Sequence, residues 1–212
     1  MDKHRQLVIL LHGIGLSYIT MKYIEYYLRK EGYEVFNIDY PSRKYTIPML
    51  ASYIQERIYA RSLNQYNKVH IIGHSLGGVL ARLIALDYKY DNLGECIALS
   101  APNRGSSLAK YLNSWRLFKI YFGPAIIDLE PGSEVLSVIK ALPIRYALIA
   151  GTRSSFTPFG WFFDEPNDGT VAVSEMIPDT LSEKNIYQFY VSHSSMLINS
   201  NVKDKIVELL KS

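Results

Sequence analysis

Short apolar runs alternate with amphipathic stretches along the 212 residues of the chain. Runs that are apolar at nearly every position indicate strands buried on both faces, as in a parallel sheet. The runs that we interpret as strands are 7–11, 33–38, 69–72, 94–100, 144–150 and 186–191. They recur along the whole chain and are separated by polar or glycine-containing turns, which favours a single α/β unit over separate α and β regions.

The stretches between these runs have apolar residues at helical spacing. Ile47, Leu50 and Ile54 share one helical face, and Thr46 stands at the expected N-cap of that helix. The same spacing occurs in 20–30, in 76–86 and in the last residues of the chain. Strand and helix therefore alternate, which predicts one domain over 1–212 with a minimal doubly wound, mostly parallel sheet of about six strands and helices on both faces.

Two segments interrupt this alternation. The segment 104–142 is less regular and includes the aromatic stretch from Trp115 to Phe122, and we expect it to form a cap-like or lid-like insertion. The segment 154–165 is an aromatic loop rich in Phe and Trp. If that loop is exposed it suits a lipid-binding rim, and if it is buried it is core packing. The sequence leaves both alternatives open.

Composition narrows the class of protein. A hydrophobic fraction of 48% and a charged fraction of 20% are typical of a globular protein, and a net charge of +3 without a basic block excludes a nucleic-acid footprint. The chain has a single cysteine, Cys96, so it cannot form an internal disulfide. Cys96 lies in an apolar run, and we interpret it as a core residue.

The same composition bears on location. No stretch approaches the roughly 18 apolar residues of a membrane span, although peripheral membrane contact is compatible with the charge. The run 7–11 is too short for the core of a signal peptide, so we expect a cytoplasmic protein. A secreted chain whose leader had been removed would look the same.

The sequence Gly73-His74-Ser75-Leu76-Gly77 joins the third apolar run to the next amphipathic stretch. A strand, a sharp turn and a helix are the context in which Gly-x-Ser-x-Gly presents a nucleophilic serine. The glycines are small because strand and helix crowd together there. Leu76 begins the helix, so its N–H lies at the positive end of the helix dipole and can stabilise an oxyanion.

A serine nucleophile needs a base, and histidine has a pKa suited to that role. His70 lies inside the strand, and His74 is adjacent to Ser75, where neighbours at a sharp turn diverge. His193 follows the last predicted strand and is flanked by small serines that leave it room to move. We therefore expect His193 to be the base.

The base needs a carboxylate that fixes its tautomer and supports its positive charge. Asp168 lies in Asn-Asp-Gly after the fifth predicted strand, where Gly169 permits a close turn. Asp164 is the rival, while Asp128 and Asp179 read as solvated carboxylates. We prefer Asp168, because the Thr-Val-Ala-Val run that follows it gives the residue a fixed position.

His12, Ser75, Asp168 and His193 all fall in loops that follow predicted strands. The carboxyl ends of parallel strands meet at one edge of a sheet, so we expect these residues to share that edge. In the glycine-containing loop after His12 the backbone can approach a substrate closely, and the N–H of Ile14 is the expected second oxyanion donor.

These pieces together resemble the α/β-hydrolase superfamily and, within it, the small bacterial lipases and esterases. The order serine, acid, histidine is typical of that architecture. The matching pieces are 11–15, 73–78, 101–106, 167–171 and His193. The chain begins directly at the strand before His12, so the two leading strands of the full fold are expected to be missing, as in minimal lipases.

The resemblance implies a serine hydrolase of carboxylic esters that acts through an acyl-serine on Ser75, with Asp168 and His193 completing the triad and Ile14 and Leu76 forming the oxyanion hole. We expect a small-molecule or lipid ester with a hydrophobic acyl group, contacted by His12, Trp161 and Phe162. A thioesterase or acyltransferase could use the same triad, and a catalytically silent binding protein could keep the fold. No metal-ligand spacing, dinucleotide fingerprint or P-loop occurs, so no cofactor is expected. The oligomeric state is left open.

Overall fold

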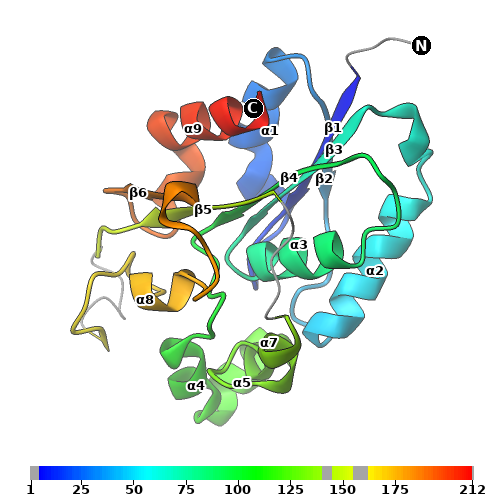
Figure 1. Ribbon diagram of the computed structural model, residues 1–212. Helices are drawn as coiled ribbons and strands as arrows, with labels where there is room; N and C mark the ends of the chain where they lie inside the picture. Colours follow the sequence, from blue (N-terminus) through cyan, green and yellow to red (C-terminus); the bar gives the residue numbers. More distant parts are fainter. Residues whose placement is uncertain (1–4, 140–144, 155–161, 212) are drawn as a thin grey trace.

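The computed structural model describes residues 5–139, 145–154 and 162–211, and its centre is a parallel β-sheet (Figure 1). Within these residues the sheet has six strands in the order β2-β1-β3-β4-β5-β6. The strands are β1 (Gln6–Leu11), β2 (Glu34–Ile38), β3 (Lys68–His74), β4 (Leu93–Leu99), β5 (Tyr146–Gly151) and β6 (Ile186–Phe189). Every neighbouring pair is parallel, so the predicted sheet is confirmed.

Helices cover both faces of this sheet. The helices α1 (Lys22–Lys30) and α9 (Ser200–Leu210) lie on one face, while α2 (Ile47–Tyr59) and α3 (Leu76–Leu86) lie on the other (Figure 1). Alternate residues of β1 divide between two apolar cores: Leu7 and Ile9 pack with α2 and α3, and Val8 and Leu10 pack with α1 and α9. This division explains why the strands are apolar at nearly every position.

The connections carry the remaining short helices. Between β4 and β5, the described part of the predicted insertion folds into α4 (Ser107–Asn113), α5 (Arg116–Phe122), α6 (Ala125–Asp128) and α7 (Glu134–Val138), at the lower end of the molecule in Figure 1. The other short elements are α8 (Val173–Met176) and the 3-10 turns η1 (Tyr18–Met21), η2 (Leu63–Gln65), η4 (Glu183–Asn185) and η5 (Ser195–Ile198).

The N-terminus of α2 differs from the expected cap. Thr46 stands at the N-cap position, but its side chain makes no capping hydrogen bond. The N–H of Ile47 instead donates to Oδ2 of Asp128, 2.6 Å away. The interpretation of Asp128 as a solvated carboxylate was therefore wrong, because burial raises its pKa and a helix start 81 residues away uses its oxygen. Asp179 is exposed as expected and pairs with Arg104 at 2.9 Å.

Chain order reverses between β1 and β3, which are neighbours in the sheet although β2 separates them in sequence. The carboxyl edge beside such a reversal is where open α/β sheets bind ligands. The loop after β1 and the turn after β3 both lie there. A Cβ built on Gly13 would come within 3.3 Å of Cβ of Ser75, so the two connections are in close contact.

The glycines of the β3–α3 turn are required by close backbone approach. A Cβ at Gly73 would overlap the carbonyl group of Gly77, and a Cβ at Gly77 would overlap the carbonyl of Leu11. Replacing Gly73 with alanine should therefore lower the free energy of unfolding by about 3 kcal/mol or more, because the strand and helix must separate.

Urea unfolding followed by circular dichroism measures this effect. Gly32→Ala is the matched control, since Gly32 has a φ of +91° but open space around the missing Cβ, so only backbone strain of about 1 kcal/mol is expected. Equal losses in the two variants would contradict the close-approach explanation.

Candidate active site

The turn that carries Ser75 is strained. Ser75 has φ 55° and ψ −124°, outside the regions that side-chain-bearing residues normally occupy. It is nearly buried, at 7% exposure, and its N–H donates to the carbonyl oxygen of Leu99 at 2.9 Å. Strain of this kind persists only where the surrounding structure holds it, and it concentrates at functional sites.

Asp168 and His193 are in direct contact. Nδ1 of His193 lies 2.6 Å from Oδ2 of Asp168, and the N–H of His193 donates to the carbonyl oxygen of Asp168 at 2.9 Å. Asp168 is fully buried and His193 is 9% exposed. The structure thus brings together two of the residues selected from the sequence, although 25 positions separate them.

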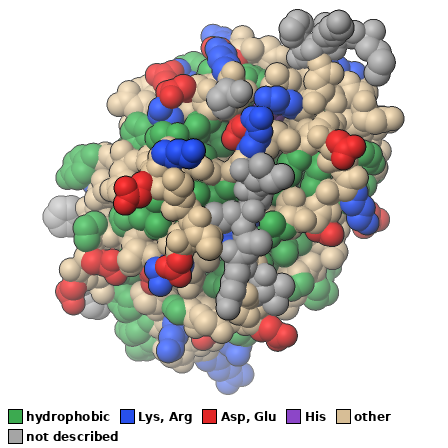
Figure 2. Space-filling model, in the orientation of Figure 1, with side chains coloured by type: hydrophobic (Ala, Val, Ile, Leu, Met, Phe, Trp, Pro, Cys, Tyr) green, Lys and Arg blue, Asp and Glu red, His purple; other side chains and the backbone are tan. Residues whose placement is uncertain are grey.

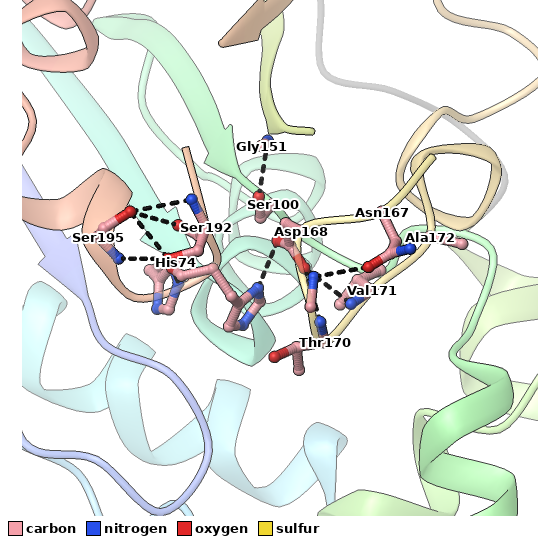
Figure 3. Close-up of polar contacts among 12 residues, drawn as sticks. His74, Ser100, Gly151, Asn167, Asp168, Thr170, Val171, Ala172, Ser192 and Ser195 are labelled. Atoms are coloured by element: carbon pink, nitrogen blue, oxygen red, sulfur yellow. Dashed lines mark hydrogen bonds and ion pairs between the residues drawn. The ribbon is translucent and has the colours of Figure 1, made fainter. Parts of the chain in front are cut away.

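The Asp168 carboxylate is held by a ring of donors (Figure 3). Its Oδ1 accepts from the backbone N–H groups of Thr170 at 3.0 Å and Val171 at 2.8 Å. Burial acts to raise the pKa of Asp168, but His193 and hydrogen bonds from His193, Val171 and the Ser100 hydroxyl outweigh it, so the pKa lies below its ordinary value. The carboxylate is therefore charged at neutral pH.

His74 also belongs to this site, although no sequence pattern selects it. Its Nε2 donates to the carbonyl oxygen of His193 at 2.9 Å, and the two rings lie 4.6 Å apart between centroids. His74 immediately precedes Ser75, so this bond ties the serine turn to the histidine loop. The ring of His74 does not bond to the adjacent Ser75 but reaches the backbone of a residue 119 positions away.

The loop that carries His193 is also more tightly held than expected. The N–H of Ser192 donates to Oγ of Ser195 at 2.9 Å, and the two hydroxyl oxygens lie 2.8 Å apart. Together with the bonds from Asp168 and His74, these contacts fix the backbone on both sides of His193. Ser192, one of the two serines that flank His193, therefore helps to hold this loop through Ser195.

The oxyanion candidates occupy the two connections that meet at the sheet edge. Leu76 is the first residue of α3, directly after Ser75. In the loop after β1, the N–H of Gly15 donates to Oγ of Ser42 at 3.0 Å and that of Leu16 to the carbonyl of Gly13 at 3.3 Å. Both of those N–H groups have partners in the protein, one in the loop that follows β2 and one in the same loop, and Ile14 lies between Gly13 and Gly15.

The three residues predicted to contact substrate differ in how the structure places them. The His12 side chain is fully buried: it stacks on Tyr40 with 4.1 Å between ring centroids, and Nδ1 lies 2.9 Å from the carbonyl oxygen of Gly13. Phe162 is half-buried and packs against Tyr111 of α4, 5.3 Å between centroids. Trp161 lies outside the described residues. Asp164, the rival acid, is exposed.

Buried neutral histidines make the fold sensitive to acid. Burial, with His193 nearby, lowers the pKa of His74 to about 3, and burial, with Lys68 and Arg145 nearby, lowers that of His70 to about 4. The unfolded chain binds protons at both positions below about pH 6.5, while the folded chain does not. Between about pH 6.5 and about pH 4.5 the free energy of unfolding should fall by about 5 kcal/mol from these two residues.

Urea titrations across this pH range measure the loss. His70→Gln should remove about half of this loss of stability, because one of the two titrating rings is gone. The variant should still fold, because an amide can replace both hydrogen bonds of the ring, from the N–H of Glu95 and to Gln6. A stability that stays constant across the range would contradict the assignment of neutral, buried rings.

Comparison of the sequence with known protein families identifies the family of this chain. The sequence profile described as "Alpha/beta hydrolase family" matches residues 8–195. The chain belongs to the α/β hydrolase family. The resemblance seen in the sequence is therefore confirmed at the level of family and fold. A search of curated protein sequences gave no match.

Solved structures of other proteins share the fold of this α/β hydrolase at low sequence identity. The mature form of the Bacillus licheniformis lipase BlEst2 is 21% identical, with a TM-score of 0.69 over 98% of this chain and 92% of that chain. An esterase from Exiguobacterium antarcticum is 17% identical, with a TM-score of 0.62 over 99% and 93%. The phospholipase PlaB from Legionella pneumophila is 19% identical, with a TM-score of 0.65 over 81% of this chain and 45% of that one.

Two further observations concern what surrounds the site. None of the helices in the described residues is both long and apolar enough to cross a membrane. In the same residues, no group of three or more His, Cys, Asp and Glu side chains is arranged to hold a metal ion. Cys96 is buried, as expected, and burial raises the pKa of its thiol.

Proposed function

We propose that this α/β hydrolase cleaves carboxylic esters with hydrophobic acyl groups, with Ser75 as nucleophile, His193 as base and Asp168 as the residue that orients the base. The observation that carries the proposal is the 2.6 Å contact between His193 and Asp168, at the sheet edge where the strained Ser75 turn also lies. The N–H groups of Ile14 and Leu76 are the proposed oxyanion donors.

The chemistry follows from the tautomer that Asp168 selects. With Nδ1–H donated to the carboxylate, Nε2 of His193 is left as an acceptor for the Ser75 proton. Oγ of Ser75 forms a bond to the ester carbonyl carbon, and the resulting oxyanion accepts hydrogen bonds from the two N–H groups. Collapse breaks the C–O bond, and the alkoxide leaves with the proton from His193. A water molecule then releases the acid by the same steps.

A panel of p-nitrophenyl esters tests this proposal. We expect hydrolysis of butyrate and octanoate esters, and labelling of the wild type by a fluorophosphonate probe. Activity confined to acetate would contradict the hydrophobic acyl group. Transfer to an added alcohol or thiol in preference to water would identify an acyltransferase, and a folded protein without labelling or turnover would identify a binding protein.

The surface of the segment between β4 and β5 favours a lipid ester. Helix α5 directs Phe118 and Phe122 toward the core, yet Leu117, Ile120 and Tyr121 on its other side are 80%, 69% and 55% exposed. A short helix that is apolar on both sides has one face that water does not favour. That face suits the acyl region of a bilayer.

Charge on the same segment favours an anionic surface. Residues 104–127 include Arg104, Lys110, Arg116 and Lys119 and no acidic residue. Arg104 pairs with Asp179, but among the described residues no carboxylate pairs with the other three. Figure 2 shows hydrophobic and cationic side chains at the lower end of the molecule, where Figure 1 places α4 and α5.

The position of α5 relates this face to the site. The ring of Phe122 is 4.0 Å from a Cβ built on Gly15, in the loop of the proposed oxyanion donor, and the Arg43 guanidinium lies over the ring of Tyr121 at 5.2 Å. Leu16 and Ile19, in and just after that loop, are also exposed. A bilayer bound to α5 would therefore lie against the sheet edge that carries Ser75.

Vesicle flotation with the Ser75→Ala protein tests the lipid part separately from catalysis. We expect binding to vesicles containing phosphatidylglycerol and weak binding to phosphatidylcholine alone. Arg116→Gln with Lys119→Gln should weaken binding by roughly 30-fold, at about 1 kcal/mol per cation. The triple variant Leu117→Ser, Ile120→Ser and Tyr121→Ser should abolish binding. Tyr26→Ser, an exposed aromatic on α1, is the control. Equal binding by all variants would contradict the role of α5.

A further inference from the structure

Ser100 has a backbone conformation that its side chain disfavours. It follows β4 directly, is fully buried and has φ 45°. Within the described residues, only Ser75 shares a positive φ among residues other than glycine. Glycine adopts such values without penalty, whereas a Cβ makes them costly. A serine at this position therefore suggests that its hydroxyl makes an interaction that glycine could not make.

That hydroxyl lies between two parts of the site. The N–H of Gly151, at the end of β5, donates to Oγ of Ser100 at 3.1 Å. The hydroxyl then still has its own proton to donate. Figure 3 shows Ser100 beside Asp168, and the Ser100 hydroxyl is one of the groups that hold the pKa of Asp168 low.

Packing leaves little freedom around this contact. A Cβ built on Gly151 would come within 3.0 Å of Cβ of Asp168 and 3.4 Å of Oγ of Ser100. The N–H of Ser100 donates to the carbonyl oxygen of Ile149 at 2.8 Å, so its backbone is tied to β5 as well. The ends of β4 and β5 and the Asp168 turn therefore meet at the Ser100 hydroxyl.

We propose that Ser100 is a positioning residue whose hydroxyl, accepting from Gly151 and donating to Asp168, fixes the carboxylate that orients His193. The inference rests on the proposed function, because positioning matters to catalysis only if Asp168 and His193 act as an acid–base pair. It assigns the strain at Ser100 to the site, in the same way as the strain at Ser75.

The decisive variant is Ser100→Gly. Glycine removes both the backbone strain and the hydroxyl, so stability should be maintained or raised while kcat/KM for an ester falls about tenfold with KM unchanged, the effect of one hydrogen bond to a charged group. Ser100→Ala should lose the same activity without the gain in stability. Full activity in the glycine variant, or activity that falls only together with stability, would overturn the proposal.

A second measurement separates this inference from the proposed function. In the Ser75→Ala background, a carbon-13 NMR titration follows the Asp168 carboxyl group without any turnover. Removing the hydroxyl in Ser100→Gly should move the acid midpoint upward, because the charged carboxylate loses a donor; Ser182→Ala, in an exposed turn, should leave it in place. A shifted midpoint, together with a wild-type protein that hydrolyses no ester, would contradict the proposed function but not the role of Ser100. An unchanged midpoint would contradict the role of Ser100, whether or not the wild-type protein hydrolyses esters.

Discussion

Replacing Ser75 with alanine should reduce kcat for ester hydrolysis on the order of 10⁶-fold, because the covalent route disappears and the remaining groups act only on the background reaction. The change removes a single oxygen from a residue that is already held in place. Its N–H bond to Leu99 and its contact with Gly13 do not involve the hydroxyl, so the fold should be retained.

The comparison needs three readouts on the same protein. Hydrolysis of a p-nitrophenyl ester gives the rate, labelling by a fluorophosphonate probe gives the nucleophile, and circular dichroism gives the fold. Ser182→Ala, in an exposed turn, should match the wild type in all three. A folded Ser75→Ala protein that keeps more than a trace of the wild-type rate would show that another group is the nucleophile.

The fold was predictable from the sequence because its determinants are local. Each strand is an apolar run, and each large helix has a regular apolar stripe, so the six-stranded sheet follows from patterns within a few residues of one another. Ser75, Asp168 and His193 were selected by the same logic, from their positions directly after strands. The contact between Asp168 and His193 then follows from the parallel arrangement of those strands.

The features that sequence reasoning missed depend on distant partners. Asp128 caps α2 across 81 positions, and His74 reaches His193 across 119. Neither contact can be predicted from the spacing of nearby residues in the sequence. His12 was expected to contact substrate because of its loop, but the depth of that loop, where His12 stacks on Tyr40, is a property of the folded layers. The positive φ of Ser100 likewise has no local signal, since glycine would be the ordinary choice.

Helix α5 shows a related limit of pattern reading. Apolar residues at helical spacing normally indicate a buried stripe, and Phe118 and Phe122 do pack against the core. Leu117, Ile120 and Tyr121 continue the apolar character around the helix but face outward. Composition alone cannot distinguish an outward apolar face from a buried one, because only the position of the neighbouring elements decides which side is covered.

The hydrogen bonds around Asp168 make Asp168→Asn a sharp test of the base. The backbone N–H groups of Thr170 and Val171 both donate to Oδ1, so the amide oxygen of an asparagine must occupy that position. The amide nitrogen then faces Nδ1 of His193 in place of Oδ2. As a donor it requires an acceptor at Nδ1, which moves the ring proton to Nε2 and blocks transfer from Ser75.

We therefore expect Asp168→Asn to fold normally and to lose about 10⁴-fold in kcat, the effect of holding a catalytic histidine in the wrong tautomer. Asp164→Asn is the matched control, since Asp164 is exposed and lies four positions earlier in the same connection; it should retain wild-type kcat. Steady-state ester kinetics on both variants decide the assignment. A large loss in Asp164→Asn together with a small loss in Asp168→Asn would reverse the choice of acid, and with it the reason that His193 is placed as it is.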